Sequence, residues 1–206
     1  MSLQMKEIVD QALTVMAKPE FGQVFIPALR QELPRYKRTE VAVAKAVVTV
    51  ATTHTSMLAR YKALETLSAM TEVKASLLSP KMAGAVAYLA AHDSNLISPG
   101  AQYVLNAHLR NGGRQEKLLL ARAKTEVTNS SPTARNFAHK MSWGVAFFTD
   151  DKKLKRIAVN ILRGGVKDHD PEVRSTAQRM LGDLSSMGLI RRPSRIARPR
   201  GYEAQR

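Results

Sequence analysis

The sequence contains no cysteine among its 206 residues, and only 5% of the residues are aromatic. Without cysteine the chain has no disulfide scaffold, no thiolate zinc site and no cysteine nucleophile. Long hydrophobic runs are also missing: the run from Val41 to Ala51 is interrupted by Lys45 and Thr49, so no segment predicts a membrane-spanning helix. Hydrophobic residues nevertheless make up 44% of the chain, which indicates a folded core and excludes a wholly disordered chain.

The first residues lack the pattern of a targeting signal. Residues 1–17 carry apolar side chains at helical spacing, but Glu7 and Asp10 interrupt the apolar stretch that a secretory signal requires. A mitochondrial presequence would be rich in arginine and poor in acids, and this segment is neither. We therefore expect an amphipathic first helix that packs on the body of a cytoplasmic protein.

Acidic residues are scarce relative to basic ones. Seventeen Asp and Glu face 32 Lys and Arg, which leaves a formal net charge of +15. Basic side chains are concentrated in residues 30–38, 110–124 and 152–156 and again near the C-terminus. Lysine and arginine neutralise phosphates and release counterions, so this charge favours nucleic-acid binding. The alternative is that each cluster is an ordinary solvated helix face.

Hydrophobic spacing and turn signals predict helices along the whole chain. The run over 40–52 is rich in β-branched residues, so a buried strand is an alternative there, but all its neighbours are helical. Paired glycines at 112–113 are expected to cap a helix, and those at 164–165 to stop one. The predicted helices span 1–17, 40–52, 55–78, 81–91, 98–111, 115–127, 131–148, 150–163 and 170–186.

Three predicted helices begin with a capping residue followed by proline: Ser98-Pro99, Ser131-Pro132 and Asp170-Pro171. Their prolines lie 33 and 39 residues apart. Spacing of this order, with one helix hairpin per unit, is typical of stacked helical repeats.

The last of these units carries a family resemblance. In residues 168–181, DHDPEVRSTAQRML, an acid precedes a Val-Arg pair, and a small residue and a leucine follow at helical spacing. This pattern resembles the second helix of a HEAT repeat, and residues 131–138 repeat it loosely. The resemblance implies an all-α fold of stacked antiparallel helix hairpins, a short HEAT-like α-solenoid. Asp168 or Asp170 is expected to cap the helix, and Arg174 to reach an acid in an adjacent repeat.

The composition divides the chain into three parts. Residues 1–78 form an N-terminal helical region, either degenerate repeats or a separate cap, and residues 79–188 form the HEAT-like repeats. Residues 189–206 contain six arginines, two prolines and one glutamate, which predicts a flexible basic C-terminal tail.

These observations favour a non-catalytic helical-repeat protein that binds a polyanion, DNA or RNA, through its phosphate backbone. The tail supplies the first candidate binding residues: Arg191, Arg192, Arg195, Arg198 and Arg200. A second group lies in and before the helix predicted over 115–127: Arg114, Lys117, Arg122 and Lys124.

Two other functions stay open. The chain could be an assembly scaffold, or a subunit of a larger particle, whose basic tail binds an acidic protein partner. It could, with less support, be an enzyme similar to the HEAT-like DNA glycosylases, although no converging aromatic and acidic residues are evident. The five histidines are scattered, and no motif predicts a metal or a cofactor. The sequence does not predict the oligomeric state.

Overall fold

The computed structural model describes residues 27–28, 31–32 and 40–190, and every regular element within 40–190 is a helix. The all-α prediction is therefore confirmed, and residues 40–53 are helical rather than the alternative strand. The elements are α3 (Glu40–Thr53), α4 (Met57–Val73), η2 (Ala75–Leu77), α5 (Pro80–His92), α6 (Ile97–Arg110), α7 (Glu116–Glu126), α8 (Pro132–Phe148), α9 (Lys152–Gly165) and α10 (Pro171–Ser186).

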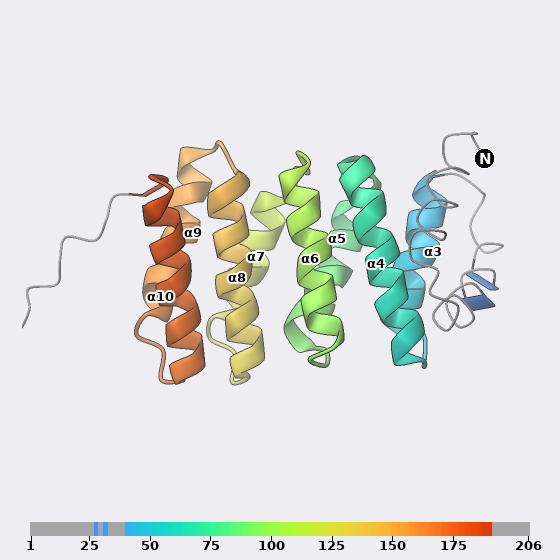
Figure 1. The fold of residues 1–206 in the computed structure, drawn as a ribbon, viewed down its shortest axis with the longest axis horizontal. Coiled ribbons are helices and arrows are strands. Elements are labelled where there is room, and N and C mark those ends of the chain that lie inside the picture. Colours follow the sequence, from blue (N-terminus) through green and yellow to red (C-terminus); the bar gives the residue numbers. More distant parts are fainter. Residues whose placement is uncertain (1–26, 29–30, 33–39, 191–206) are drawn as a thin grey trace, which may run out of the picture.

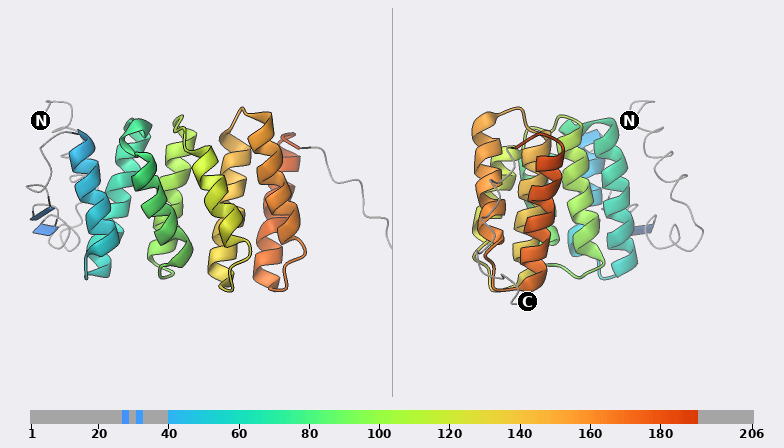
Figure 2. Two further views of the ribbon diagram at one scale, coloured as in Figure 1. Left: turned by 180° about the vertical axis from the view of Figure 1, so that it is seen from behind. Right: turned by 60° about the vertical axis from the view of Figure 1, so that its left-hand side comes forward.

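The helices lie in two layers. Figure 1 shows α4, α6, α8 and α10 side by side in one layer, and the view from behind in Figure 2 shows α3, α5, α7 and α9 in the other. Each odd-numbered helix packs against the even-numbered helix that follows it, and α4 also packs against α6 and α8 against α10. The α3–α4 hairpin is thus packed against the next hairpin along the chain.

The core between the layers is rich in alanine. Fully buried alanines such as Ala44, Ala63, Ala90 and Ala138 let neighbouring helices approach closely, and larger side chains such as Phe137 fill the remaining space. The other aromatic side chains of α8, Trp143, Phe147 and Phe148, pack against this core. Helix α4 buries Leu64, Leu67 and Met70, whereas Met57 and Val73 at its two ends are 40% and 65% exposed.

Local sequence signals define several helix ends, although the side chain of Ser131, an expected cap, makes no capping hydrogen bond at the start of α8. Ser79, Asp151 and Asp170 each accept hydrogen bonds from backbone N–H groups in the first turn of α5, α9 and α10. Gly112 has a φ of +80°, and the N–H of Gly113 donates to the carbonyl of His108 at 2.8 Å. This is the left-handed glycine cap expected after α6.

Several expected boundaries differ from the structure. The helix expected over 55–78 ends as α4 at Val73, and the short η2 follows it. Helix α6 begins at Ile97, and Ser98 lies buried inside it, where its hydroxyl donates to the carbonyl of Ala90 at 2.6 Å instead of capping the helix. Gly164 and Gly165 form the last turn of α9 and do not stop it before residue 164. Leu189 and Ile190, expected in the tail, pack against the core, while residues 191–206 lie outside the described part of the chain.

Equivalent arginines join neighbouring hairpins. Arg60 in α4 binds Asp93, and Arg135 in α8 binds Asp168, each 33 residues further along the chain. Arg174 holds the corresponding place in α10. It donates to the carbonyls of Asp168 and His169 and, among the described residues, has no carboxylate partner, so its expected bond to an acid is not formed. Of the two acids expected to cap α10, Asp170 does so, and Asp168 binds Arg135 of the preceding hairpin.

None of the helices within residues 40–190 combines the length and the apolar composition needed to cross a lipid bilayer.

Candidate nucleic-acid interface

Basic side chains are concentrated on the exposed side of α7 and α9, neighbours in the layer seen from behind in Figure 2. Arg114, just before α7, and two lysines within it are exposed to solvent. The larger group belongs to α9 and the turn after it. We call the whole set the α7–α9 basic face: Arg114, Lys117, Lys124, Lys152, Lys153, Lys155, Arg156, Arg163 and Lys167.

The sequence of α9 explains this arrangement. Ala158, Val159 and Leu162 are buried on one side of the helix, and the opposite side is polar. No acidic residue occurs between Lys152 and Gly165, so nothing along the helix interrupts its positive charge. Asp151 precedes the helix, and its carboxylate is occupied by the N–H groups of Lys153 and Leu154.

Ion pairing distinguishes the α7–α9 basic face from the basic residues of α4 and α6. In α4, α6 and the turn after α4, the basic residues Arg60, Lys62, Lys74 and Arg110 each bind a carboxylate. Within residues 40–190, by contrast, no member of the α7–α9 basic face has a carboxylate within 4.0 Å. No acidic side chain of residues 40–190 therefore competes with an external anion for these cations.

The structure separates the four residues predicted around α7. Arg114, Lys117 and Lys124 are exposed and belong to the basic face. Arg122 instead forms an ion pair with the buried carboxylate of Glu126 at 2.6 Å, and its guanidinium lies 5.5 Å from the ring centre of Tyr88. Arg122 thus stabilises the packing of α7 against α5. The five predicted tail arginines, Arg191, Arg192, Arg195, Arg198 and Arg200, lie outside the described residues.

Sequence reasoning noted the charge of residues 152–156 but did not select them, and it missed Arg163 and Lys167. The lack of acidic residues within α9 was a usable signal for this helix. The pair formed by Arg122 was also foreseeable, since Glu126 follows it by four residues, the spacing at which helical side chains meet.

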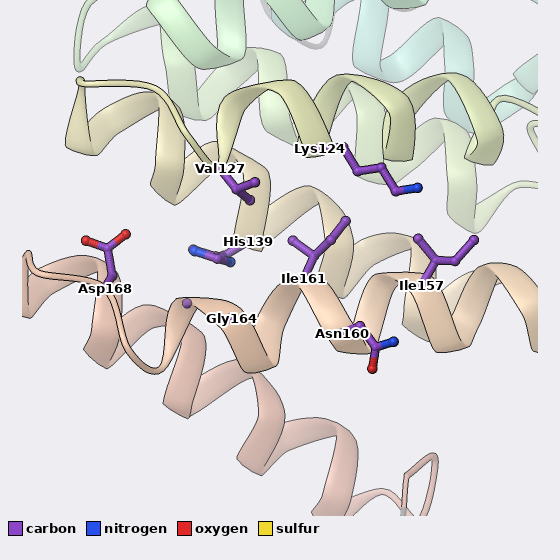
Figure 3. A pocket seen from close by; sticks show the side chains of 9 residues that line it. Lys124, Val127, His139, Ile157, Asn160, Ile161, Gly164 and Asp168 are labelled. Carbon is purple, nitrogen blue, oxygen red and sulfur yellow. The ribbon is translucent and has the colours of Figure 1, made fainter.

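A groove of about 520 Å³ lies between α7 and α9. Lys124 and Val127 line it from the α7 side, and Ile157 and Ile161 point toward it from α9, whereas the Asn160 side chain points away from α7 (Figure 3). His139 of α8 and Asp168 line it as well, in the half of the groove away from the Lys124 ammonium group in Figure 3.

His139 and Asp168 have opposite electrostatic environments. Burial lowers the pKa of His139, although the nearby charge of Asp168 opposes this effect, so the imidazole is neutral at pH 7. Burial alone would raise the pKa of Asp168, but hydrogen bonds from Arg135 and the N–H of Asp170 outweigh it and lower that pKa. Asp168 is therefore an ionised carboxylate held by structural partners.

Residues 40–190 hold no group of three or more His, Asp or Glu side chains placed to bind a metal ion.

Comparison with known proteins adds little to this geometry. No family model matches the sequence, and no curated protein matches it. Among solved structures, an engineered protein is similar over 86% of this chain and 79% of its own, with 14% sequence identity and a TM-score of 0.43. A similarity this low assigns neither a family nor a function.

Proposed function

We propose that this protein is a non-catalytic, HEAT-like helical-repeat protein that binds DNA or RNA through its phosphate backbone. The observation that carries the proposal is the α7–α9 basic face, whose nine cations have no carboxylate partner among residues 40–190. We expect the tail arginines to contribute further phosphate contacts, and the protein to act in the cytoplasm.

The dimensions of the face suit a polyanion. The 14 residues of α9 span about 20 Å, several phosphate spacings along a nucleic-acid strand. Lysine and arginine contacts to phosphate position a strand without reading its bases, so we expect binding with little sequence preference. An acidic protein partner is the competing ligand for this face, and in that case the chain would serve as an assembly scaffold.

Fluorescence anisotropy with labelled duplex DNA and single-stranded RNA, over a series of salt concentrations, tests the proposal. The test variant, Lys117→Gln with Lys153→Gln, removes one exposed lysine from each helix of the face. The matched control, Lys45→Gln with Lys81→Gln, removes two exposed lysines of α3 and α5 at the other end of the same layer.

We expect micromolar or tighter binding near physiological salt. The test variant should reduce the slope of log affinity against log salt by about 1.4–1.8, since each phosphate contact contributes about 0.7–0.9. The control should leave the slope unchanged. Equal slopes for both variants would show that the α7–α9 basic face is not the interface. Absence of binding at moderate salt would overturn nucleic-acid binding altogether and leave the acidic protein partner.

A further inference from the structure

Tyr88 of α5 is an exposed aromatic side chain in the layer that carries the α7–α9 basic face. The residue is 57% exposed, whereas Trp143, Phe147 and Phe148 pack against the core. Helix α5 packs against α7, and α7 packs in turn against α9 (Figure 2). An exposed aromatic ring therefore adjoins the basic face on the side away from α9.

Arg122 of α7 and His92 of α5 both contact the ring of Tyr88. The Arg122 guanidinium lies 5.5 Å from the centre of the tyrosine ring, and the centre of the imidazole ring lies 4.8 Å from it. A terminal nitrogen of Arg122 also lies 2.8 Å from Nε2 of His92. Because these two partners contact each other, they do not cover opposite faces of the tyrosine ring. One face of the ring is therefore open, in agreement with its large exposed fraction.

The buried carboxylate of Glu126 fixes both partners of the ring. The Glu126 side chain is 2% exposed, and its Oε1 lies 2.6 Å from Arg122 and 3.0 Å from Nε2 of His92. The amide of Asn129 donates to Oε2 of the same carboxylate at 3.0 Å. This network holds the ring of Tyr88 in place before a ligand arrives, so little conformational entropy is lost when the ring is used for binding.

A flat ring beside exposed cations suits a ligand that carries both flat groups and negative charge. Lys117 and Lys124 of α7 are exposed and have no carboxylate partner within residues 40–190. A simple inorganic anion would use these lysines but not the ring. A single-stranded nucleic acid uses both, because it presents a base with a flat face for every phosphate.

We infer that Tyr88 stacks on an unpaired base of a single-stranded nucleic acid whose phosphates lie on the α7–α9 basic face. Single-stranded binding proteins combine a basic surface that follows the backbone with aromatic side chains on which the bases stack. The bases of a duplex are already stacked on one another, so Tyr88 favours single strands over duplexes. This inference rests on the proposed function of the basic face.

A second exposed tyrosine allows a matched test. Tyr103 is 56% exposed, but it belongs to α6 in the other layer, where its hydroxyl donates to a carboxylate oxygen of Glu72 at 3.4 Å. Tyr88→Leu removes the flat ring and keeps an apolar side chain, and Tyr103→Leu makes the same exchange away from the basic face. Tyr88→Phe keeps the ring and removes only the hydroxyl.

The probes are a labelled single-stranded DNA, a strand of equal length made of abasic residues, and the corresponding duplex, over one series of salt concentrations. The wild-type chain should bind the normal strand about tenfold more tightly than the abasic strand. Tyr88→Leu should lose most of this preference while it keeps the salt slope and its affinity for the abasic strand and the duplex. Tyr88→Phe and Tyr103→Leu should behave like the wild type.

Failure of this inference is distinguishable from failure of the proposed function. Equal affinity of the wild type for normal and abasic strands, or equal behaviour of Tyr88→Leu and Tyr103→Leu, would overturn base stacking while phosphate binding stands. An equal loss in Tyr88→Phe and Tyr88→Leu would also overturn it, since phenylalanine retains the ring. Absence of salt-dependent binding to all three probes would overturn both proposals together.

Discussion

Arg135 and Asp168 form a buried ion pair that joins two consecutive helix hairpins. The Nε of Arg135 donates to Oδ2 of Asp168 at 2.8 Å, and a terminal nitrogen of the same guanidinium donates to Oδ1 at 3.1 Å. Its other terminal nitrogen donates to the carbonyls of Asn129 and Ser130 in the turn before α8. The Arg135 guanidinium thus binds two turns: the turn before α8, through the carbonyls, and the turn before α10, through Asp168.

The first prediction concerns this pair. The side chains of Arg135 and Asp168 are 3% and 9% exposed, so Arg135→Ala leaves a buried carboxylate without its main partner. We expect a loss of about 3–5 kcal/mol in the free energy of unfolding, measured by urea denaturation. The matched control is Arg174→Ala at the equivalent place in α10, where only hydrogen bonds to carbonyls are lost, and about 1–2 kcal/mol is expected. Equal losses would contradict a special role for the pair.

The Asp168 carboxylate should also make the free energy of unfolding depend on pH under acidic conditions. The pKa of Asp168 is lowered in the folded chain because its bonds to Arg135 and to the N–H of Asp170 outweigh the effect of burial. Its stabilising contribution is therefore complete above the unfolded value of about 3.9 and is lost as the pH falls through the lower folded value. Asp168→Asn should be less stable at pH 7 and should lose less stability between pH 5 and pH 3. The urea denaturation midpoints of the wild-type chain and of Asp168→Asn, measured at each pH, test this difference. If both midpoints fell equally with pH, the prediction would be wrong.

Two buried histidines should make the free energy of unfolding depend on pH in a higher range than Asp168 does. Burial lowers the pKa of His108, against the effects of the Ala75 carbonyl and of Glu116, and burial also lowers the pKa of His139. Below about pH 6.5 the unfolded chain binds protons that the folded chain does not, so stability is complete above this value and falls toward pH 5. Replacing both by glutamine should flatten this part of the stability curve. An unchanged slope in the double variant would mean that these imidazoles titrate normally.

The helices were predictable because their signals are local. The Ser-Pro and Asp-Pro starts at Ser79 and Asp170 and the glycine cap at Gly112 depend on residues within one turn of the helix end. Ser98 does not cap a helix, because its hydroxyl donates to the carbonyl of Ala90 inside the core. Ala90 lies eight residues earlier in the chain, outside the range of a local signal.

The candidate site was less predictable because it depends on contacts between helices. Charge counting placed Arg122 beside Lys124, but only the arginine faces the buried Glu126 and is neutralised. The groove needs side chains from α7, α8 and α9 together, and no spacing in the sequence brings His139 next to Gly165. The residue types therefore indicated phosphate binding, and the packing of the helices decided which basic side chains are available for it.

The last prediction separates the two adjacent glycines that end α9. A Cβ on Gly165 would collide with the ring of His139 and with the side chain of Ala177, whereas a Cβ on Gly164 would meet no atom within 4 Å. Gly165→Ala should therefore lower the free energy of unfolding by about 1–3 kcal/mol through overpacking. Gly164→Ala should raise it by about 0.5–1 kcal/mol, since alanine restricts the unfolded chain and favours the helix.

Urea denaturation of the two single variants, side by side, measures this difference. A stabilising effect of both would show that α8 and α10 can move apart from Gly165 at no cost. Opposite signs would show that the close approach of the His139 ring to the α9 backbone does not relax when a methyl group is added.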